Sequence, residues 1–248
     1  MEPAVISAPL VVRSGICIAL QIENIPAPQC SSISCRMPLE RIRSTLKKEA
    51  VRHKITDLCA DHFDPVSGRN AYRSVKDPHI FRQQLEELHA AEHHSFSPQI
   101  EQEIRKIEWC DLMIWQFPLW WFSLPAVFKG YVDRVFAMGR AYKSSCFYAD
   151  GLFKGKQAML SLTTGGPESM YHAAGENGDM KTILSPITHG ILEFTGFRVL
   201  EPHIVYAPAH MDADRRREAL DRLEERIRSL TGNIALRQKN APLLRMEP

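Results

Sequence analysis

The chain has 248 residues, of which 44% are hydrophobic and 24% charged, a composition that allows one sizeable hydrophobic core. Its formal net charge of +2, with basic residues scattered along the sequence, gives no reason to expect nucleic acid or an anionic membrane surface as a partner. No run approaches the ~18 apolar residues of a membrane span, and the N-terminus lacks the pattern of a signal peptide.

From about residue 54 the sequence alternates between strand and helix patterns. The expected strands are residues 16–20, 54–58, 111–117, 157–162 and 199–206. The expected helices lie around residues 81–88, 98–107, 125–138, 180–194 and 212–230. Pro38 stands where the first helix should begin, so we expect that helix to start only at Leu39.

Strands separated by helices of this length predict an α/β fold with a parallel sheet, right-handed crossovers and helices on both faces. We expect a flavodoxin-like open sheet with strand order 2-1-3-4-5, because its switch point places two loops around one planar ligand. Residues 1–231 are expected to form a single domain, irregular over 1–45, and 232–248 a loose tail.

The six cysteines form no CxxC pair and no zinc-like spacing. The absence of these patterns favours a reduced, cytoplasmic chain. His89 and His93 stand four residues apart on a predicted helix, but no third ligand follows, so we expect no metal site.

An aromatic block follows the strand at 111–117 and contains Trp120, Trp121 and Phe122. This block is expected at the carboxyl edge of the sheet, where open α/β sheets bind flat ligands. For one of the three rings we expect core packing instead. A second loop, 163–166, follows the strand at 157–162 and reads Thr-Thr-Gly-Gly.

The two glycines of that second loop allow close backbone approach and expose N–H donors, although a plain turn explains them as well. Adjacent parallel strands end side by side, so one loop would present aromatic faces and the other backbone donors and hydroxyls. That combination suits an isoalloxazine ring, which needs apolar contact on its faces and hydrogen bonds along one edge.

Several segments between about residues 54 and 230 match the motifs of one known family, with similar spacing between them. They are Phe117–Ala126, Lys129–Gly130, Asp133–Phe136, Leu162–Gly166, Ser169–Tyr171, Gly190–Leu192, Gly196–Phe197, Val199–Pro202 and His210–Arg216. In these segments the chain resembles the NAD(P)H:quinone oxidoreductase (DT-diaphorase-like) family. The resemblance implies a flavodoxin-like homodimer that binds FAD, or FMN in some relatives. It also implies that hydride passes from NAD(P)H to flavin and then to a quinone in the same place, in a ping-pong sequence.

The resemblance also implies roles for individual residues. Those expected to contact the flavin ring or its polar edge are Leu119, Trp120, Trp121, Phe122, Thr163, Thr164, Gly165 and Gly166. Tyr171 would donate its hydroxyl near the flavin oxygen that becomes negative on reduction. Arg216 would reach the adenosine or phosphate end of FAD. Tyr142 and Tyr148 would line the substrate pocket from the other subunit.

Asn177 is the first of three departures from the family pattern, because animal members carry a catalytic His there. Asn donates a hydrogen bond but cannot become cationic, so we expect altered tuning of the reaction with activity retained. The second departure is Ala27, which replaces the His that precedes the phosphate-binding segment; Ser32 and Ser34 are the candidate phosphate contacts. The third is Arg82, which stands where many relatives have Gln.

Two alternatives differ from the quinone reductase in class or chemistry. One is a regulatory or ancillary flavodoxin-like subunit with weak or no flavin binding, which the atypical N-terminal 45 residues favour. The other is an FMN-dependent azo- or nitroreductase of the same fold.

Overall fold

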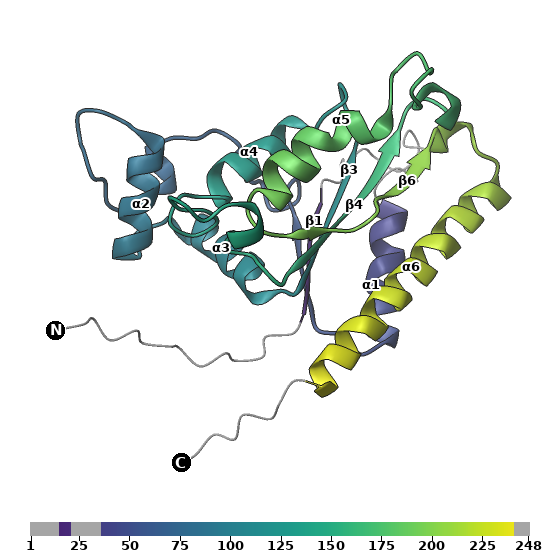
Figure 1. The fold of residues 1–248 in the computed structure, drawn as a ribbon, viewed down its shortest axis with the longest axis horizontal. Coiled ribbons are helices and arrows are strands. Elements are labelled where there is room, and N and C mark those ends of the chain that lie inside the picture. Colours follow the sequence, from purple (N-terminus) through teal and green to yellow (C-terminus); the bar gives the residue numbers. More distant parts are fainter. Residues whose placement is uncertain (1–14, 21–35, 241–248) are drawn as a thin grey trace.

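The computed structural model describes residues 15–20 and 36–240, which form one α/β unit (Figure 1). The strands are β1 (Ile16–Leu20), β2 (His53–Asp57), β3 (Leu112–Pro118), β4 (Gln157–Thr164), β5 (Arg198–Val199) and β6 (His203–Tyr206). The α-helices are α1 (Arg36–Lys48), α2 (Gln83–His93), α3 (Pro98–Trp109), α4 (Ala126–Val135), α5 (Met180–Ile187) and α6 (Ala213–Asn240). Shorter helical turns are η1 (Arg69–Ala71), η2 (Tyr148–Asp150), η3 (Glu168–Met170), η4 (Thr188–Glu193) and η5 (Pro208–His210).

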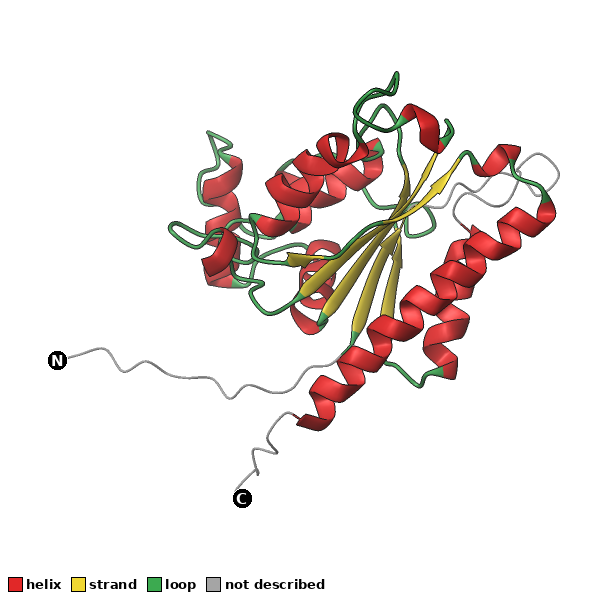
Figure 2. Ribbon diagram, turned by 45° about the vertical axis from the view of Figure 1, so that its right-hand side comes forward, coloured by secondary structure: helices red, strands yellow, loops and turns green. Residues whose placement is uncertain are grey.

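The strands pair in the order β2-β1-β3-β4-β5, which confirms the predicted order 2-1-3-4-5. All the pairings are parallel, and β6 pairs with the carboxyl half of β4 while β5 pairs with its amino half. Parallel pairing brings the ends of β3, β4 and β6 to one edge of the sheet (Figure 2). Loops that follow these strands therefore meet at that edge.

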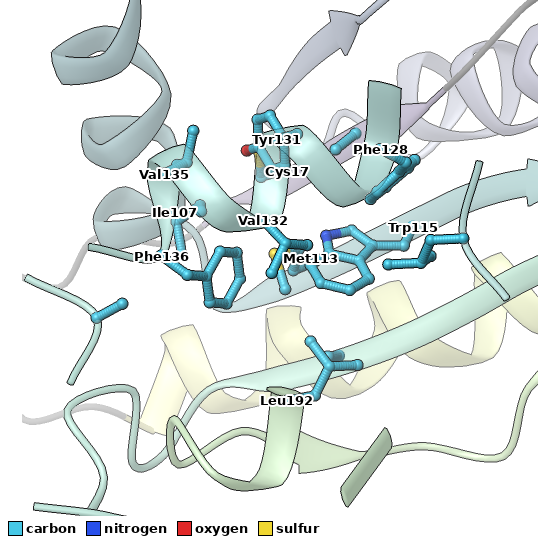
Figure 3. Close-up of a cluster of buried hydrophobic side chains, with 14 of the residues drawn as sticks. Cys17, Ile107, Met113, Trp115, Phe128, Tyr131, Val132, Val135, Phe136 and Leu192 are labelled. Carbon is cyan, nitrogen blue, oxygen red and sulfur yellow. The ribbon is translucent and has the colours of Figure 1, made fainter. Parts of the chain in front are cut away.

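Two hydrophobic cores lie on opposite faces of the sheet, because successive strand residues point to opposite sides. On β1, Ile16 and Ile18 face α1 and α6, whereas Cys17 and Ala19 face the helices of the other side. Figure 2 shows α1 and α6 together on one face and α3, α4 and α5 on the other. Trp115 of β3 is 1% exposed and lies within the core on the face covered by α3, α4 and α5 (Figure 3).

The expectation that α1 begins at Leu39 is wrong, because the helix starts at Arg36 and includes Pro38 in its first turn. The first N–H groups of a helix have no acceptor within the helix. Proline therefore removes no hydrogen bond at that position and costs little there.

Two other expected elements are interrupted, each near a proline. The predicted strand at 199–206 is split into β5 and β6 around Pro202, which has no N–H to give to a ladder. The predicted helix at 180–194 changes after Pro186 from the α-helix α5 to the π-helix η4. At the C-terminus α6 continues to Asn240, past residue 231, where we expected the domain to end.

Candidate active site

The aromatic loop and the glycine loop leave the sheet side by side. Pro118 at the end of β3 is in register with Thr163 of β4. One residue further, the backbone N–H of Leu119 donates to the carbonyl oxygen of Thr163 at 2.8 Å. The prediction that residues 118–122 and 163–166 lie next to each other is therefore confirmed.

All three rings of the aromatic loop face outward. Trp120, Trp121 and Phe122 are 43%, 94% and 47% exposed, so the expectation that one of them packs in the core is wrong. Trp115 and Phe117 fill the core from β3 instead, with less than 2% exposure. Large exposed rings beside a sheet edge are available to stack on a flat ligand.

The backbone of the aromatic loop is strained. Trp121 and Phe122 have φ angles of +49° and +59°, in the left-handed region that bulky residues avoid. Each such residue costs roughly 1–2 kcal/mol. Strain of this kind is kept where surrounding structure and function require it, and it clusters at ligand sites.

The glycine loop has an open side and a side that a phenol ring covers. A Cβ atom placed on Gly165 would meet nothing within 4 Å, so the backbone there is open to a ligand. A Cβ on Gly166 would lie 3.0 Å from Sδ of Met170, 3.4 Å from Cε2 of Tyr171 and 3.5 Å from its hydroxyl oxygen. Thr164 is buried and its hydroxyl donates to the carbonyl oxygen of Gly166 at 2.8 Å, which shapes the turn.

Tyr171 and Asn177 come directly after the glycine loop in the chain. The ring of Tyr171 lies 5.7 Å from that of Tyr206, at the end of β6. Burial, together with nearby Glu168, raises the pKa of Tyr206. The backbone N–H of Asn177 donates to the carbonyl oxygen of Met170 at 2.9 Å, which folds the 171–178 turn back towards Tyr171.

Arg216, in the first turns of α6, lines a small cavity of about 20 Å³ that also reaches Thr163. The remaining lining residues are Pro38, Gln116, Ser161, Leu162, His203, Val205, Met211, Ala219, Leu220 and Leu223. Within the described part of the chain, the buried Nε atom of Arg216 has no hydrogen-bond partner. A buried donor without a partner costs about 1–3 kcal/mol, so this atom is suited to a ligand acceptor.

His203 of β6 lines the same cavity, and nothing in the sequence marked it. Its pKa is lowered to about 4, chiefly by burial and also by Arg222 and Arg226, so the ring is neutral. Its Nε2 atom is buried and, like Nε of Arg216, has no partner among the described residues.

Tyr142 and Tyr148 lie together, but away from the two loops. Their rings are 5.9 Å and 5.6 Å from that of Phe194, which directly follows η4. Tyr148 and Phe194 precede β4 and β5 respectively, whose first residues pair with each other. This tyrosine cluster therefore belongs to the amino edge of the sheet, whereas the two loops belong to the carboxyl edge.

The remaining expected contacts, Ser32 and Ser34, lie outside the described residues. Over residues 15–20 and 36–240, no three His, Cys, Asp or Glu side chains gather as a metal ion would need. None of the helices in those ranges combines the length and the apolar character of a membrane-crossing segment.

These residues fit a flavin. Exposed aromatic faces lie beside a glycine turn whose backbone is open at Gly165, and the Tyr171 phenol lies next to Gly166. Arg216, with an unsatisfied guanidinium nitrogen, lines a cavity together with Thr163. A parallel sheet of order 2-1-3-4-5 with such a ligand edge defines the flavodoxin-like class of proteins.

Comparisons with known proteins agree with this class and narrow it. The family model described as flavodoxin-like fold matches residues 34–228. The chain is 42% identical over 186 residues to NAD(P)H dehydrogenase (quinone) 1 of Cavia porcellus, across 75% of this chain and 68% of that one. It is 36% identical over 186 residues to ribosyldihydronicotinamide dehydrogenase (quinone) of Homo sapiens, across 75% and 80% of the two chains.

A solved structure gives the same result. A candidate quinone reductase of Klebsiella pneumoniae superposes with a TM-score of 0.79 at 30% identity, over 87% of this chain and 85% of that one. The chain therefore belongs to the NAD(P)H:quinone oxidoreductase family of flavodoxin-like proteins.

Proposed function

We propose that this chain is a flavin-dependent NAD(P)H:quinone oxidoreductase that transfers two electrons in each turnover. The observation that carries the proposal is the hydrogen bond from Leu119 to Thr163, which holds exposed aromatic rings beside an open glycine turn. The names of the relatives from Cavia porcellus and Homo sapiens indicate quinone reduction for those proteins, and the shared family supports it here.

A bound flavin supplies the hydride chemistry, accepting from NAD(P)H and giving to a quinone. The protein's own residues would bind the flavin, orient the substrates against it and exclude water. Trp121 and Phe122 would contact the ring faces and keep water away. Backbone N–H groups at Gly165 and Gly166, with the hydroxyl of Tyr171, would donate to the polar edge, where negative charge develops. Because one face serves both substrates, we propose that the nicotinamide leaves before the quinone enters.

FAD is the cofactor that Arg216 favours. FMN ends at one phosphate, whereas FAD carries an adenylate that extends beyond it. Arg216 and Thr163 line the same small cavity, and the Nε atom of Arg216 is buried without a partner among the described residues. A cation in that place serves an adenylate or second phosphate, which only FAD offers.

We propose a homodimer, which the placing of Tyr142 and Tyr148 supports. The eight residues of β4 separate this tyrosine cluster from the glycine loop in one chain, which is about 25 Å of strand. A substrate pocket that contains both therefore needs the tyrosine cluster of a second copy. We propose a reducing, cytoplasmic location, which the free thiols of Cys17, Cys110 and Cys146 support.

The proposal is tested on purified protein. We expect the absorbance bands of oxidised flavin, their loss on adding NAD(P)H, and their return on adding a quinone. Formation of hydroquinone without one-electron reduction of cytochrome c indicates two-electron transfer. A preparation that stays colourless after addition of FAD would support the regulatory subunit instead. Extracted FMN, with azo or nitro compounds reduced faster than quinones, would support the azo- or nitroreductase.

A further inference from the structure

Helix α2 buries two adjacent carboxylates, Glu86 and Glu87, which are 1% and 3% exposed. Carboxylates are almost never fully buried unless they have partners. Glu86 accepts the backbone N–H groups of Lys76 and Asp77 at 2.6 Å and 3.1 Å, so it holds the loop before α2. Glu87 has separate partners, which are Gln83 of α2 and Met138 after α4.

One oxygen of Glu87 joins α2 to the segment after α4, and the other bonds within α2. Oε2 accepts the backbone N–H of Met138 at 2.8 Å, and Oε1 accepts Nε2 of Gln83 at 2.8 Å. Gln83 also donates to the carbonyl oxygen of Asp133, at 2.8 Å. Burial raises the pKa of Glu87, although both hydrogen bonds act in the opposite direction. Burying the charged carboxylate is therefore unfavourable, and the hydrogen bonds only partly offset this.

The segment 137–142 lies flat along α2 and ends at Tyr142. A Cβ on Gly139, whose φ is +88°, would be 2.8 Å from Cβ of Ala91, so only glycine allows this approach. The N–H of Gly139 donates to the carbonyl oxygen of Tyr142 at 2.7 Å. Nε2 of Gln84 donates to the hydroxyl of Tyr142 at 3.3 Å. Successive turns of α2 thus hold the segment at several points.

We propose that Glu87 is a positioning residue that sets Tyr142 as a wall of the substrate site. Tyr142 and Glu87 line one groove of about 360 Å³ between α2, α4 and η4, with Phe136 and Phe194. A carboxylate that fixes the N–H of Met138 fixes the start of the turn that presents the Tyr142 ring. This inference rests on the proposed function, in which the quinone contacts Tyr142.

Hydrogen exchange measured by mass spectrometry tests the positioning without any need for activity. In Glu87→Ala we expect the peptide that contains residues 137–142 to exchange at least tenfold faster than in the native protein. Glu87→Gln keeps an amide oxygen for Met138 and is expected to show a smaller increase. The matched control is Glu92→Gln on the exposed face of α2, where exchange should not change. Native exchange rates in this peptide for both Glu87 variants would overturn the proposal.

Steady-state kinetics test the consequence for substrate. For Glu87→Gln, which keeps the shape of the side chain, we expect the KM for quinone to rise at least threefold while flavin affinity and kcat stay within twofold. Faster exchange with an unchanged KM would overturn the positioning role and leave Glu87 a structural residue. Failure of the proposed function looks different, since native protein would then reduce no quinone while the exchange result still stands.

Discussion

The backbone nitrogen of Leu119 lies 2.8 Å from the carbonyl oxygen of Thr163, and this one hydrogen bond couples the aromatic loop to the glycine loop. The bond extends the ladder between β3 and β4 by one residue beyond Pro118. The spacing of the two loops is thus set by sheet geometry, in which neighbouring strands lie about 4.8 Å apart. The aromatic side chains of one loop and the open backbone at Gly165 in the other are then available to a ligand.

Trp121→Gly should separate stability from cofactor binding. The ring is 94% exposed and its residue has a φ of +49°, so glycine loses little burial and relieves the strain. We expect the cofactor-free protein to keep its stability or gain about 1 kcal/mol, while flavin affinity falls. Urea unfolding and flavin fluorescence titration measure the two quantities. Val66→Ala, at another exposed apolar residue, should change neither. A clear loss of stability in cofactor-free Trp121→Gly would contradict this reading of the loop.

Tyr171→Phe should slow reduction by NAD(P)H. A hydrogen bond to a charged group contributes about 1.5–3 kcal/mol, and the lower value already corresponds to about tenfold in rate. Stopped-flow absorbance measures the rate directly. The control is Tyr206→Phe, whose ring lies 5.7 Å from that of Tyr171 and should have a smaller effect. Equal rates in native protein and Tyr171→Phe would exclude a role for this hydroxyl.

Asn177→His should speed reduction by NAD(P)H, most strongly below pH 7. Histidine has an ordinary pKa of about 6.5, so it is cationic in acid and can stabilise negative charge there, whereas Asn cannot. The advantage should fade as the pH rises through that value. Rates measured from pH 5.5 to 8.5, with Asn177→Ala as control, show the trend. A pH-independent effect would mean that charge is not the cause.

Arg216→Ala should reduce affinity for FAD by about tenfold, the effect of losing one charged hydrogen bond. Affinity for FMN should stay the same, because Arg216 is expected to contact only the adenylate part. Equilibrium titration of the cofactor-free protein with each flavin measures the ratio. Arg217→Ala removes the neighbouring exposed cation, which pairs with Asp214 at 3.3 Å, and serves as the control. Equal losses for FAD and FMN would place Arg216 at the shared phosphate.

His203 should make the protein less stable in weak acid. Its pKa is about 4 in the folded chain and about 6.5 when unfolded. Between these values the unfolded chain binds a proton that the folded chain does not, so stability falls as the pH drops from 6.5 to 4. The loss is up to about 3 kcal/mol. His203→Gln should remove it in urea unfolding at pH 4–7, and His79→Gln, at an exposed residue, should not. An unchanged pH profile in His203→Gln would exclude this residue as the cause.

The sheet and its ligand edge were predictable because strands and helices leave periodic signals within a few residues. The apolar runs of β3 and β4 indicated buried parallel strands, and the loops after neighbouring parallel strands lie side by side. The boundary errors at Pro38, Pro186 and Pro202 arose because a proline's effect depends on whether its missing N–H had an acceptor, which the local sequence does not state.

The amino-acid order by itself determined the strand order, the family and the two loops that define the ligand edge. Only the tertiary structure decided that Trp121 points into solvent on a strained backbone, that Tyr142 belongs to the opposite edge, and that Glu87 holds Met138. The physical reason is the distance along the chain over which each interaction acts. Backbone periodicity is a property of neighbouring residues, whereas a contact between residues 87 and 138 exists only once α2 and the end of α4 have packed together.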